Sequence, residues 1–187
     1  MKNKSKFLNL ICVITVYFFG VIITSSQNVD FTKENFSGNA EGLKEAQSNI
    51  KKGEELFRAG TQMYKRALDH YLKANSYNPE NADLNFKIGV CYLYSSFKQK
   101  SIPHLEKARK LNSDVNDKLY YYLGRAYHLD MEWDKAIINY TEYKKRIVGS
   151  EEEKTSDADK KIQECKYGIE FMKDTLRFAK LPDSLRY

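Results

Sequence analysis

Proline, cysteine and histidine are scarce in this 187-residue chain, and each scarcity excludes a class of structure. The chain has 3 Pro, so long stretches contain no residue that breaks a helix. The 3 Cys and 3 His form no cluster with the spacing of a metal site, so the sequence predicts no metal and no cofactor. Cys91 and Cys165 both fall in predicted helices, where buried free thiols or a disulfide remain open alternatives.

Motifs for catalysis are also missing. The chain has no glycine-rich phosphate loop, no Gly-x-Ser-x-Gly and no His-Glu-x-x-His. Glu151, Glu152 and Glu153 are consecutive and are interpreted as a solvated charge run in a loop. The sequence therefore predicts a protein that is not an enzyme and has no small-molecule substrate.

The amino end has the three parts of a secretory signal peptide. Lys2, Lys4 and Lys6 precede an apolar run over 7–23, and small polar residues follow at 24–26. We expect residues 1–26 to be the signal and cleavage to occur before Gln27, so that the protein is exported. An uncleaved membrane anchor is the alternative.

The net charge of the chain is small once this segment is removed. The whole chain has 31 basic and 25 acidic residues, for a net charge of +6. Without its three N-terminal lysines the net charge is +3, which is too small to favour a nucleic-acid partner.

Aromatic residues and an internal repeat dominate what remains. The 14 Tyr and 10 Phe are numerous for the length, and such rings pack helix interfaces and line protein-binding grooves. Ala67, Tyr71, Ala74 and Pro79 recur 34 residues later as Ser101, Leu105, Ala108 and Ser113. Ile88-Gly89-x-x-Tyr92 recurs 35 residues later as Leu123-Gly124-x-x-Tyr127, and Ala136 and Tyr140 continue that unit. A period of this length predicts a stack of helical hairpins.

These residues resemble the tetratricopeptide repeat (TPR) family, over residues 43 to 148. The family pattern has a large apolar residue, Gly and then Tyr in the first helix of each unit, followed by small, aromatic and small residues in the second helix. The resemblance implies an all-α, right-handed superhelix of about three helix-turn-helix repeats plus a C-terminal capping helix. Gly53, in the first unit, stands two residues out of register. The expected repeat-packing residues are Ala67, Tyr71, Ala74, Gly89, Tyr92, Ala108, Gly124, Tyr127, Ala136 and Tyr140.

The expected organisation has four parts. Residues 1–26 are the signal peptide, 27–42 a flexible leader, 43–178 the TPR domain with its cap, and 179–187 a tail. Residues 148–157 are predicted to be a loop before a last amphipathic helix over 157–178. That helix has apolar residues at helical spacing, namely Ile162, Cys165, Ile169, Met172 and Leu176.

TPR proteins bind a peptide or a partner helix on the concave face formed by their first helices. Mapping that face onto this chain gives Glu54, Phe57, Arg58, Phe86, Lys87, Val90, Tyr94, Lys118, Tyr121, Tyr122, Arg125 and His128. The mixture of aromatic and cationic side chains suits a protein segment with some negative charge. Two alternatives remain open: the aromatic residues pack between helices, or the chain is a structural subunit that self-associates through its helix ends at Ile169, Met172 and Leu176.

A narrower resemblance concerns the stretches 77–93 and 121–137. With the signal peptide and the leader, they are similar to the amino-terminal TPR segment of Bacteroidetes envelope proteins that continue into β-propeller repeats and an OmpA-like domain. Some members of that group serve gliding motility or type IX secretion. This resemblance implies the periplasm or an outer-membrane assembly as the location, and envelope proteins as the partners.

Overall fold

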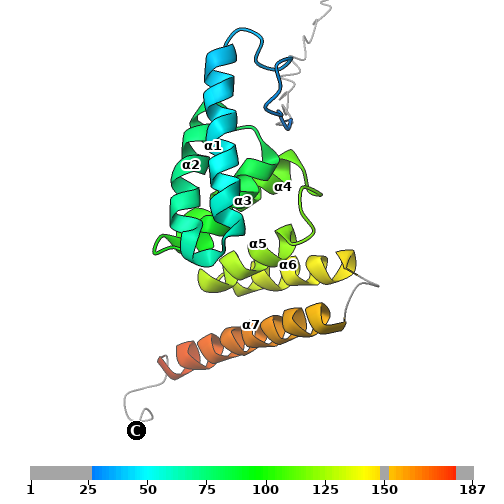
Figure 1. Cartoon of the computed structure of the whole chain (residues 1–187). Coiled ribbons are helices and arrows are strands. Elements are labelled where there is room, and N and C mark those ends of the chain that lie inside the picture. The colour runs from blue at the N-terminus through cyan, green and yellow to red at the C-terminus, as the bar shows by residue number, and fades with distance from the viewer. Residues whose placement is uncertain (1–26, 148–151, 180–187) are drawn as a thin grey trace, which may run out of the picture.

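The computed structural model describes residues 27–147 and 152–179, and its regular secondary structure within those ranges is entirely helical (Figure 1). The elements are α1 Ala40–Arg58, η1 Thr61–Met63, α2 Tyr64–Tyr77, α3 Ala82–Leu93, η2 Lys98–Lys100, α4 Ser101–Leu111, α5 Leu119–Leu129, α6 Trp133–Arg146 and α7 Glu152–Ala179. The predicted signal peptide and the tail beyond residue 179 lie outside the described residues. None of the helices in the described part is both long and apolar enough to cross a bilayer.

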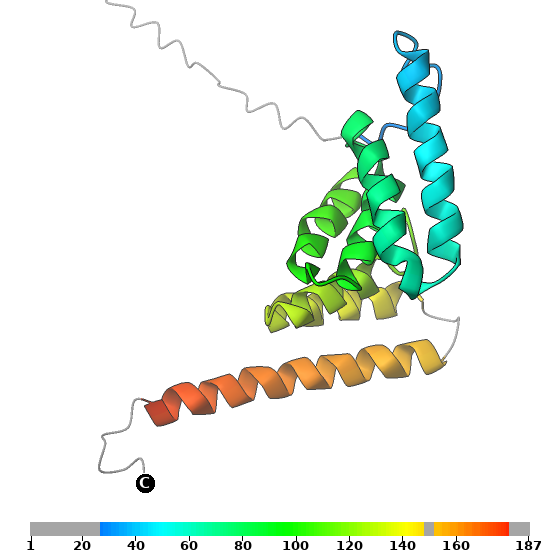
Figure 2. The same ribbon diagram turned by 60° about the vertical axis from the view of Figure 1, so that its left-hand side comes forward.

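The helices pair in chain order. α1 packs on α2, α3 on α4 and α5 on α6, and the stacking of α2 on α3, of α4 on α5 and of α6 on α7 joins the pairs (Figure 2). A single hairpin leaves its apolar face exposed, and stacking buries that face against the next hairpin. The predicted fold class is therefore confirmed: an all-α stack of three TPR-type hairpins with a seventh α-helix at its end.

Glycines allow the close approach within each hairpin. A Cβ atom at Gly89 would lie 2.6 Å from Cγ of Leu105, and one at Gly124 would lie 2.7 Å from Cδ1 of Tyr140. At Gly53 it would lie 2.5 Å from Cε1 of Tyr71. Any larger residue at these positions would overlap the second helix.

Gly53 therefore packs as Gly89 and Gly124 do, although it stands two residues out of register in the sequence. Tyr71 follows Gly53 by two more residues than Leu105 follows Gly89. The connection between α1 and α2 contains the short helix η1 and Gly60, whose φ of 109° is one that residues with side chains rarely adopt. This connection, residues 59–63, is two residues longer than residues 130–132 between α5 and α6, whose Gly124 and Tyr140 are 16 positions apart, and it takes up the difference from that hairpin.

The expected repeat-packing residues line the contacts between helices. Ala67, Ala74, Ala108 and Ala136 are fully buried, as are the rings of Tyr71 and Tyr140. Tyr92 is also buried. Tyr127 is half-buried and donates a hydrogen bond from its hydroxyl to Oε1 of Glu106, 2.8 Å away.

The segment expected to be a flexible leader packs against the stack. The backbone N–H of Val29 donates to the carbonyl of Glu80 at 2.7 Å, and its carbonyl accepts from Nδ2 of Asn78 at 2.8 Å. Asn39 caps α1, its side chain accepting from the N–H of Gly42 at 2.9 Å. The first helix thus begins at Ala40, directly after its cap Asn39. The predicted start at residue 43 corresponds to Leu43, the first buried residue of this helix.

α7 begins at Glu152, so the loop predicted over 148–157 is wrong from that residue on. Glu152 and Glu153, two residues of the acidic run that suggested a loop, belong to the first turn of the helix, where negative residues favour helix formation. Ala158, Ile162 and Cys165 are buried, 39 residues after the buried Leu119, Leu123 and Ala126 of α5. At the same offset, exposed Gln163 and Lys166 stand where α5 has Gly124 and Tyr127. α7 therefore keeps the inner face of a first helix and has polar residues at two positions where a second helix would pack. This is the expected pattern of a capping helix.

Both cysteines of the described chain are buried free thiols, Cys91 in α3 and Cys165 in α7. Burial raises the pKa of Cys91 to about 12 and that of Cys165 to about 11. Each thiol therefore stays protonated and packs as a small apolar group.

Candidate functional site

The predicted binding face includes α3, which is the first helix of the middle hairpin, and it depends on which side chains of α3 are exposed. Of its 12 residues 10 are buried, because α3 contacts α2, α4 and α5 together. Phe86 and Val90 are among the buried residues, so their prediction as partner-binding residues is wrong. Phe86 packs edge-on against Tyr122 of the next hairpin, with ring centroids 5.8 Å apart. On this helix only Asp83 and Lys87 remain accessible, together with Tyr94 at its C-terminal end.

Lys87 is not a free cation. Its ammonium group pairs with Glu54 of α1 and with Asp83 one turn earlier, at 2.6 Å from Oδ2 of Asp83. Burial alone would lower the pKa of Lys87, but the hydrogen bonds and charges of the two carboxylates outweigh it and raise the pKa. Lys87 therefore joins the first two hairpins, and the face has less positive charge than the sequence suggested.

Aromatic rings connect the first two hairpins beside this ion pair. Phe57 of α1 stacks on Tyr64, with centroids 4.5 Å apart and the planes at 2°. Tyr64 meets the ring of Tyr94 edge-on at 5.3 Å. Burial is the main cause that raises the pKa of the Tyr64 phenol. Tyr64 was missed by sequence reasoning because it begins a second helix, whereas the repeat pattern assigns the groove to first helices alone.

Arg125 of α5 continues this line of contacts into the third hairpin. Its Nη1 donates to the hydroxyl of Tyr94 at 2.8 Å, and its guanidinium carbon lies 4.7 Å from the centre of the Tyr94 ring. This cation–π and hydrogen-bonded arrangement is called the Tyr94–Arg125 contact below. Tyr94 is 39% exposed, so a partner can reach both side chains.

Tyr121 and Tyr122 of α5 are half-buried and have different neighbours. Tyr121 packs against Tyr140 and Tyr143 of α6, and its hydroxyl donates to Oδ2 of Asp157 in α7 at 2.8 Å. Burial raises the pKa of Tyr122 to about 12, so its hydroxyl remains a hydrogen-bond donor at neutral pH. Tyr121 therefore packs between helices, which is one of the two alternatives given above, and it joins α7 to the third hairpin.

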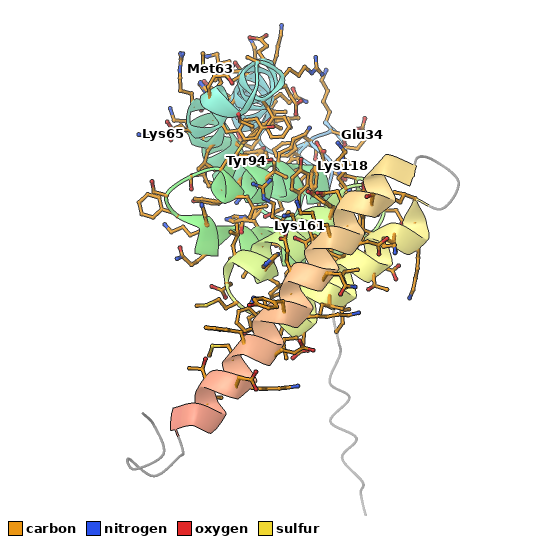
Figure 3. All side chains as sticks on the ribbon, turned by 90° about the horizontal axis from the view of Figure 1, so that it is seen from below. Glu34, Met63, Lys65, Tyr94, Lys118 and Lys161 are labelled. Atoms are coloured by element: carbon orange, nitrogen blue, oxygen red, sulfur yellow. The ribbon has the colours of Figure 1, made fainter. Side chains whose placement is uncertain are left out.

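Lys118 and Arg58 complete the predicted set as exposed cations. In the part of the chain that the structure describes, neither Lys118 nor Arg125 forms an ion pair with a carboxylate. Figure 3 labels Tyr94 and Lys118 on the repeat stack and Lys161 on α7. The accessible surface is thus an aromatic and cationic patch, which we define as Tyr94, Lys118 and Arg125 and call the groove patch.

His128 does not belong to the groove patch. Its ring lies edge-on to Tyr140, with centroids 6.4 Å apart, and it is half-buried. Burial lowers the pKa of His128, and Glu164 and Lys161, whose charges also act on it, belong to α7. His128 therefore lies near the capping helix, and its contact with a partner stays a prediction.

The other two histidines form matching hydrogen bonds in consecutive hairpins. Nδ1 of His70 lies 3.1 Å from Oδ1 of Asn49, and Nδ1 of His104 lies 3.0 Å from Oδ1 of Asn85. These pairs join the first helix of each unit to its second. Among the described residues no three His, Cys, Asp or Glu side chains are placed to hold a metal ion.

His104 gives the fold an expected dependence on pH. Burial, with a smaller contribution from Lys107, lowers the pKa of His104 below its ordinary value of about 6.5. The unfolded chain then takes up the proton first, so stability is complete above about pH 6.5 and is lost as pH falls toward the folded pKa. The third hairpin has Asn139 at the position equivalent to His104. We expect His104→Asn to reduce the fall in melting temperature between about pH 7.5 and 5.5, measured by circular dichroism. A slope unchanged in the variant would contradict this assignment.

Comparison with known proteins gives one distant similarity. No family model matches the chain. The BBSome complex member BBS4 of Mus musculus is 29% identical over 143 residues, which is 76% of this chain and 26% of that protein. The chain thus spans about a quarter of the length of this relative, so what the whole relative does applies here only as a proposal. The comparison does not support the likeness to OmpA-like envelope proteins.

Proposed function

We propose that this chain is a non-catalytic TPR-type scaffold that binds a segment of another protein at the groove patch. The similarity to a member of a protein complex supports a role in protein binding. The single observation that supports this location is the Tyr94–Arg125 contact, an exposed aromatic ring that holds a guanidinium group in place. Tyrosine and arginine are enriched among the residues that dominate binding energy at protein interfaces.

The charges of the face indicate the chemistry of the segment. Lys87 is already paired with two carboxylates, whereas Lys118 and Arg125 have no carboxylate partner among the described residues. A bound segment with one or two acidic residues would supply that partner, and an apolar or aromatic residue beside them would pack on Tyr94. Pre-organisation of Arg125 by Tyr94 reduces the conformational entropy that binding costs.

The proposed place of action is outside the cytoplasm, in the cell envelope, and the partners are envelope proteins. This part of the proposal depends on the signal-peptide pattern of residues 1–26 and on the narrower resemblance described above. Amino-terminal sequencing of the protein from a periplasmic fraction tests it. A chain that begins at Gln27 would support export, and one that retains Met1 in the cytoplasm would contradict it.

A photo-crosslinker at position 94 tests the groove patch directly. We expect p-benzoylphenylalanine in place of Tyr94 to crosslink a defined partner, because Tyr94 is exposed beside Arg125. The same substitution at Ile138, which is 66% exposed on α6, is the control for random capture. Mass spectrometry identifies the crosslinked species.

Charge reversal then tests the role of the cation. Arg125→Glu is expected to abolish the crosslink at position 94, since it removes the group that pairs with the acidic segment. Arg66→Glu makes the same change on the exposed side of α2 and should leave the crosslink intact. If Arg125→Glu and the unmodified background crosslink the same proteins equally, the groove patch is not the binding surface.

A further inference from the structure

The stack repeats one contact between successive units, and the middle copy of that contact differs from the other two. Tyr64, Lys98 and Trp133 occupy equivalent positions, because each stands seven residues before the residue that faces the hairpin glycine. Tyr64 begins α2 and Trp133 begins α6, whereas Lys98 belongs to the short helix η2 and α4 begins three residues later. The middle hairpin therefore has a lysine where the other two hairpins have an aromatic ring.

The residue that meets this position from the next first helix is also equivalent in the three contacts. Tyr94, Leu129 and Gly168 are separated by 35 and then 39 residues, which are the offsets between α3 and α5 and between α5 and α7. Tyr64 meets Tyr94 edge-on, with ring centroids 5.3 Å apart. A Cβ at Gly168 would lie 2.9 Å from Cε2 of Trp133, so that ring lies directly against α7. In both of these contacts an aromatic ring of the chain fills the space between units.

A hollow of about 170 Å³ lies at the middle contact instead. It is lined by Lys98 and Gln99 of η2 and by Ala126, Leu129 and Asp130 at the end of α5. The exposed Lys98 does not cover Leu129, which is 48% exposed. An engineered apolar cavity of about 150 Å³ holds a benzene ring. The hollow therefore has room for one aromatic ring.

The lining residues indicate a ring with a hydrogen-bond donor at its edge. Leu129 and Ala126 offer apolar surface to the ring, and an ammonium group such as that of Lys98 attracts the face of an aromatic ring. The carboxylate of Asp130 accepts hydrogen bonds, and within the described ranges neither Asp130 nor Lys98 belongs to an ion pair. Their opposite charges balance, so a neutral ligand is favoured. A tyrosine side chain combines one six-membered ring with a hydroxyl that donates, and it thus matches each of these groups.

We propose that this hollow, which we call the middle slot, binds a tyrosine side chain of another protein. The two equivalent contacts support this occupant, because the chain fills them with the rings of Tyr64 and Trp133. Leu129 lies one helical turn after Arg125 on α5, so the middle slot adjoins the groove patch but shares no residue with it. The proposal does not rest on the groove patch, and its failure would leave the proposed function untouched.

Binding of N-acetyl-tyrosinamide, followed by ¹H–¹⁵N NMR, tests the proposal. We expect saturable shifts at the backbone amides of residues 98, 99, 129 and 130, with a dissociation constant on the order of 1–10 mM for a ligand of this size. N-acetyl-leucinamide has apolar surface but neither a ring nor a hydroxyl. It should bind more weakly by about fivefold or more, because it loses the cation–π contact and the hydrogen bond.

Filling the slot from within gives a second test. Lys98→Tyr places a ring where Tyr64 and Trp133 stand in the other hairpins, and it should weaken binding of N-acetyl-tyrosinamide by about tenfold or more. Lys145→Tyr adds the same ring on α6 at a side chain that is 70% exposed, and it should leave the binding unchanged. Far-UV circular dichroism verifies that both variants are folded.

Three results would overturn the proposal. They are the absence of saturable shifts up to about 50 mM probe, equal binding of the leucine derivative, and undiminished binding to Lys98→Tyr. Shifts at residues 98 and 129 that follow protein concentration alone would assign the middle slot to a second copy of the chain, and they would also overturn a partner of another kind.

Discussion

Replacing Gly124 with valine is expected to lower the free energy of unfolding by about 2–3 kcal/mol, the range of overpacking in a dense core. A Cβ atom there would lie 2.7 Å and 2.8 Å from two carbons of the Tyr140 ring, and valine adds two further methyl groups. The ring cannot move aside, because Tyr140 is fully buried between α5 and α7. The third hairpin must therefore open, and the capping helix that packs on it must shift with it.

Gly38→Val is the matched control for this substitution. Gly38 precedes α1, and a Cβ there would meet no heavy atom within 4 Å. Urea denaturation followed by far-UV circular dichroism compares the two variants, and the midpoint should fall for Gly124→Val alone. Equal midpoints for both variants would show that the close approach of α5 and α6 is not required.

The same contact explains how much of the fold the sequence could predict. Gly89, Gly124 and the residues they face, Leu105 and Tyr140, stand at a fixed spacing, and that spacing is enough to place two hairpins. Gly53 has a different spacing from Tyr71 and yet makes the same contact. A repeat pattern detects equal intervals along the chain, whereas packing requires only that the helices meet, which connections of different length allow.

The binding face was harder to predict because it depends on which side chains each helix buries. Phe86 and Val90 occupy groove positions in the repeat pattern, but α3 is enclosed by three neighbouring helices and both residues lie in the core. Lys87 was expected to be one of the cations that meet the partner, but it pairs with Glu54, which lies 33 positions away on another helix. Tyr94 and Arg125 were both predicted, although their mutual contact spans 31 positions and no local pattern encodes it.

Replacing Tyr140 with alanine is expected to cost about 3–5 kcal/mol, the usual range for deleting a buried aromatic ring. Its ring contacts Tyr121 at 5.8 Å and His128 at 6.4 Å between centroids, and it shares a buried cluster with Ile162 and Cys165 of α7. The cavity would therefore weaken the attachment of α7 most directly. Trp133, the single tryptophan of the chain, packs against Gly168 of α7 and is a natural fluorescent probe of that attachment.

Two measurements on the alanine variant separate local from global loss. In a stack of repeats each unit is stabilised mainly by its neighbours, so damage at one end need not unfold the other end. We expect the fluorescence transition of Trp133 to occur at lower urea concentration than the transition in far-UV circular dichroism. Coincident transitions would show that the three hairpins and α7 unfold as one unit.

Tyr140→Phe isolates the hydroxyl from the ring. Among the described residues the buried Tyr140 hydroxyl has no hydrogen-bond partner, and burial raises its pKa, so the phenol stays neutral. Removing an unsatisfied buried hydroxyl should be neutral or should stabilise the fold by up to about 1 kcal/mol. A loss of about 2 kcal/mol in the phenylalanine variant would mean that the hydroxyl is bonded in solution. A neutral result together with the large loss in Tyr140→Ala would assign the role of this residue to ring packing, which is what the Gly124 contact requires.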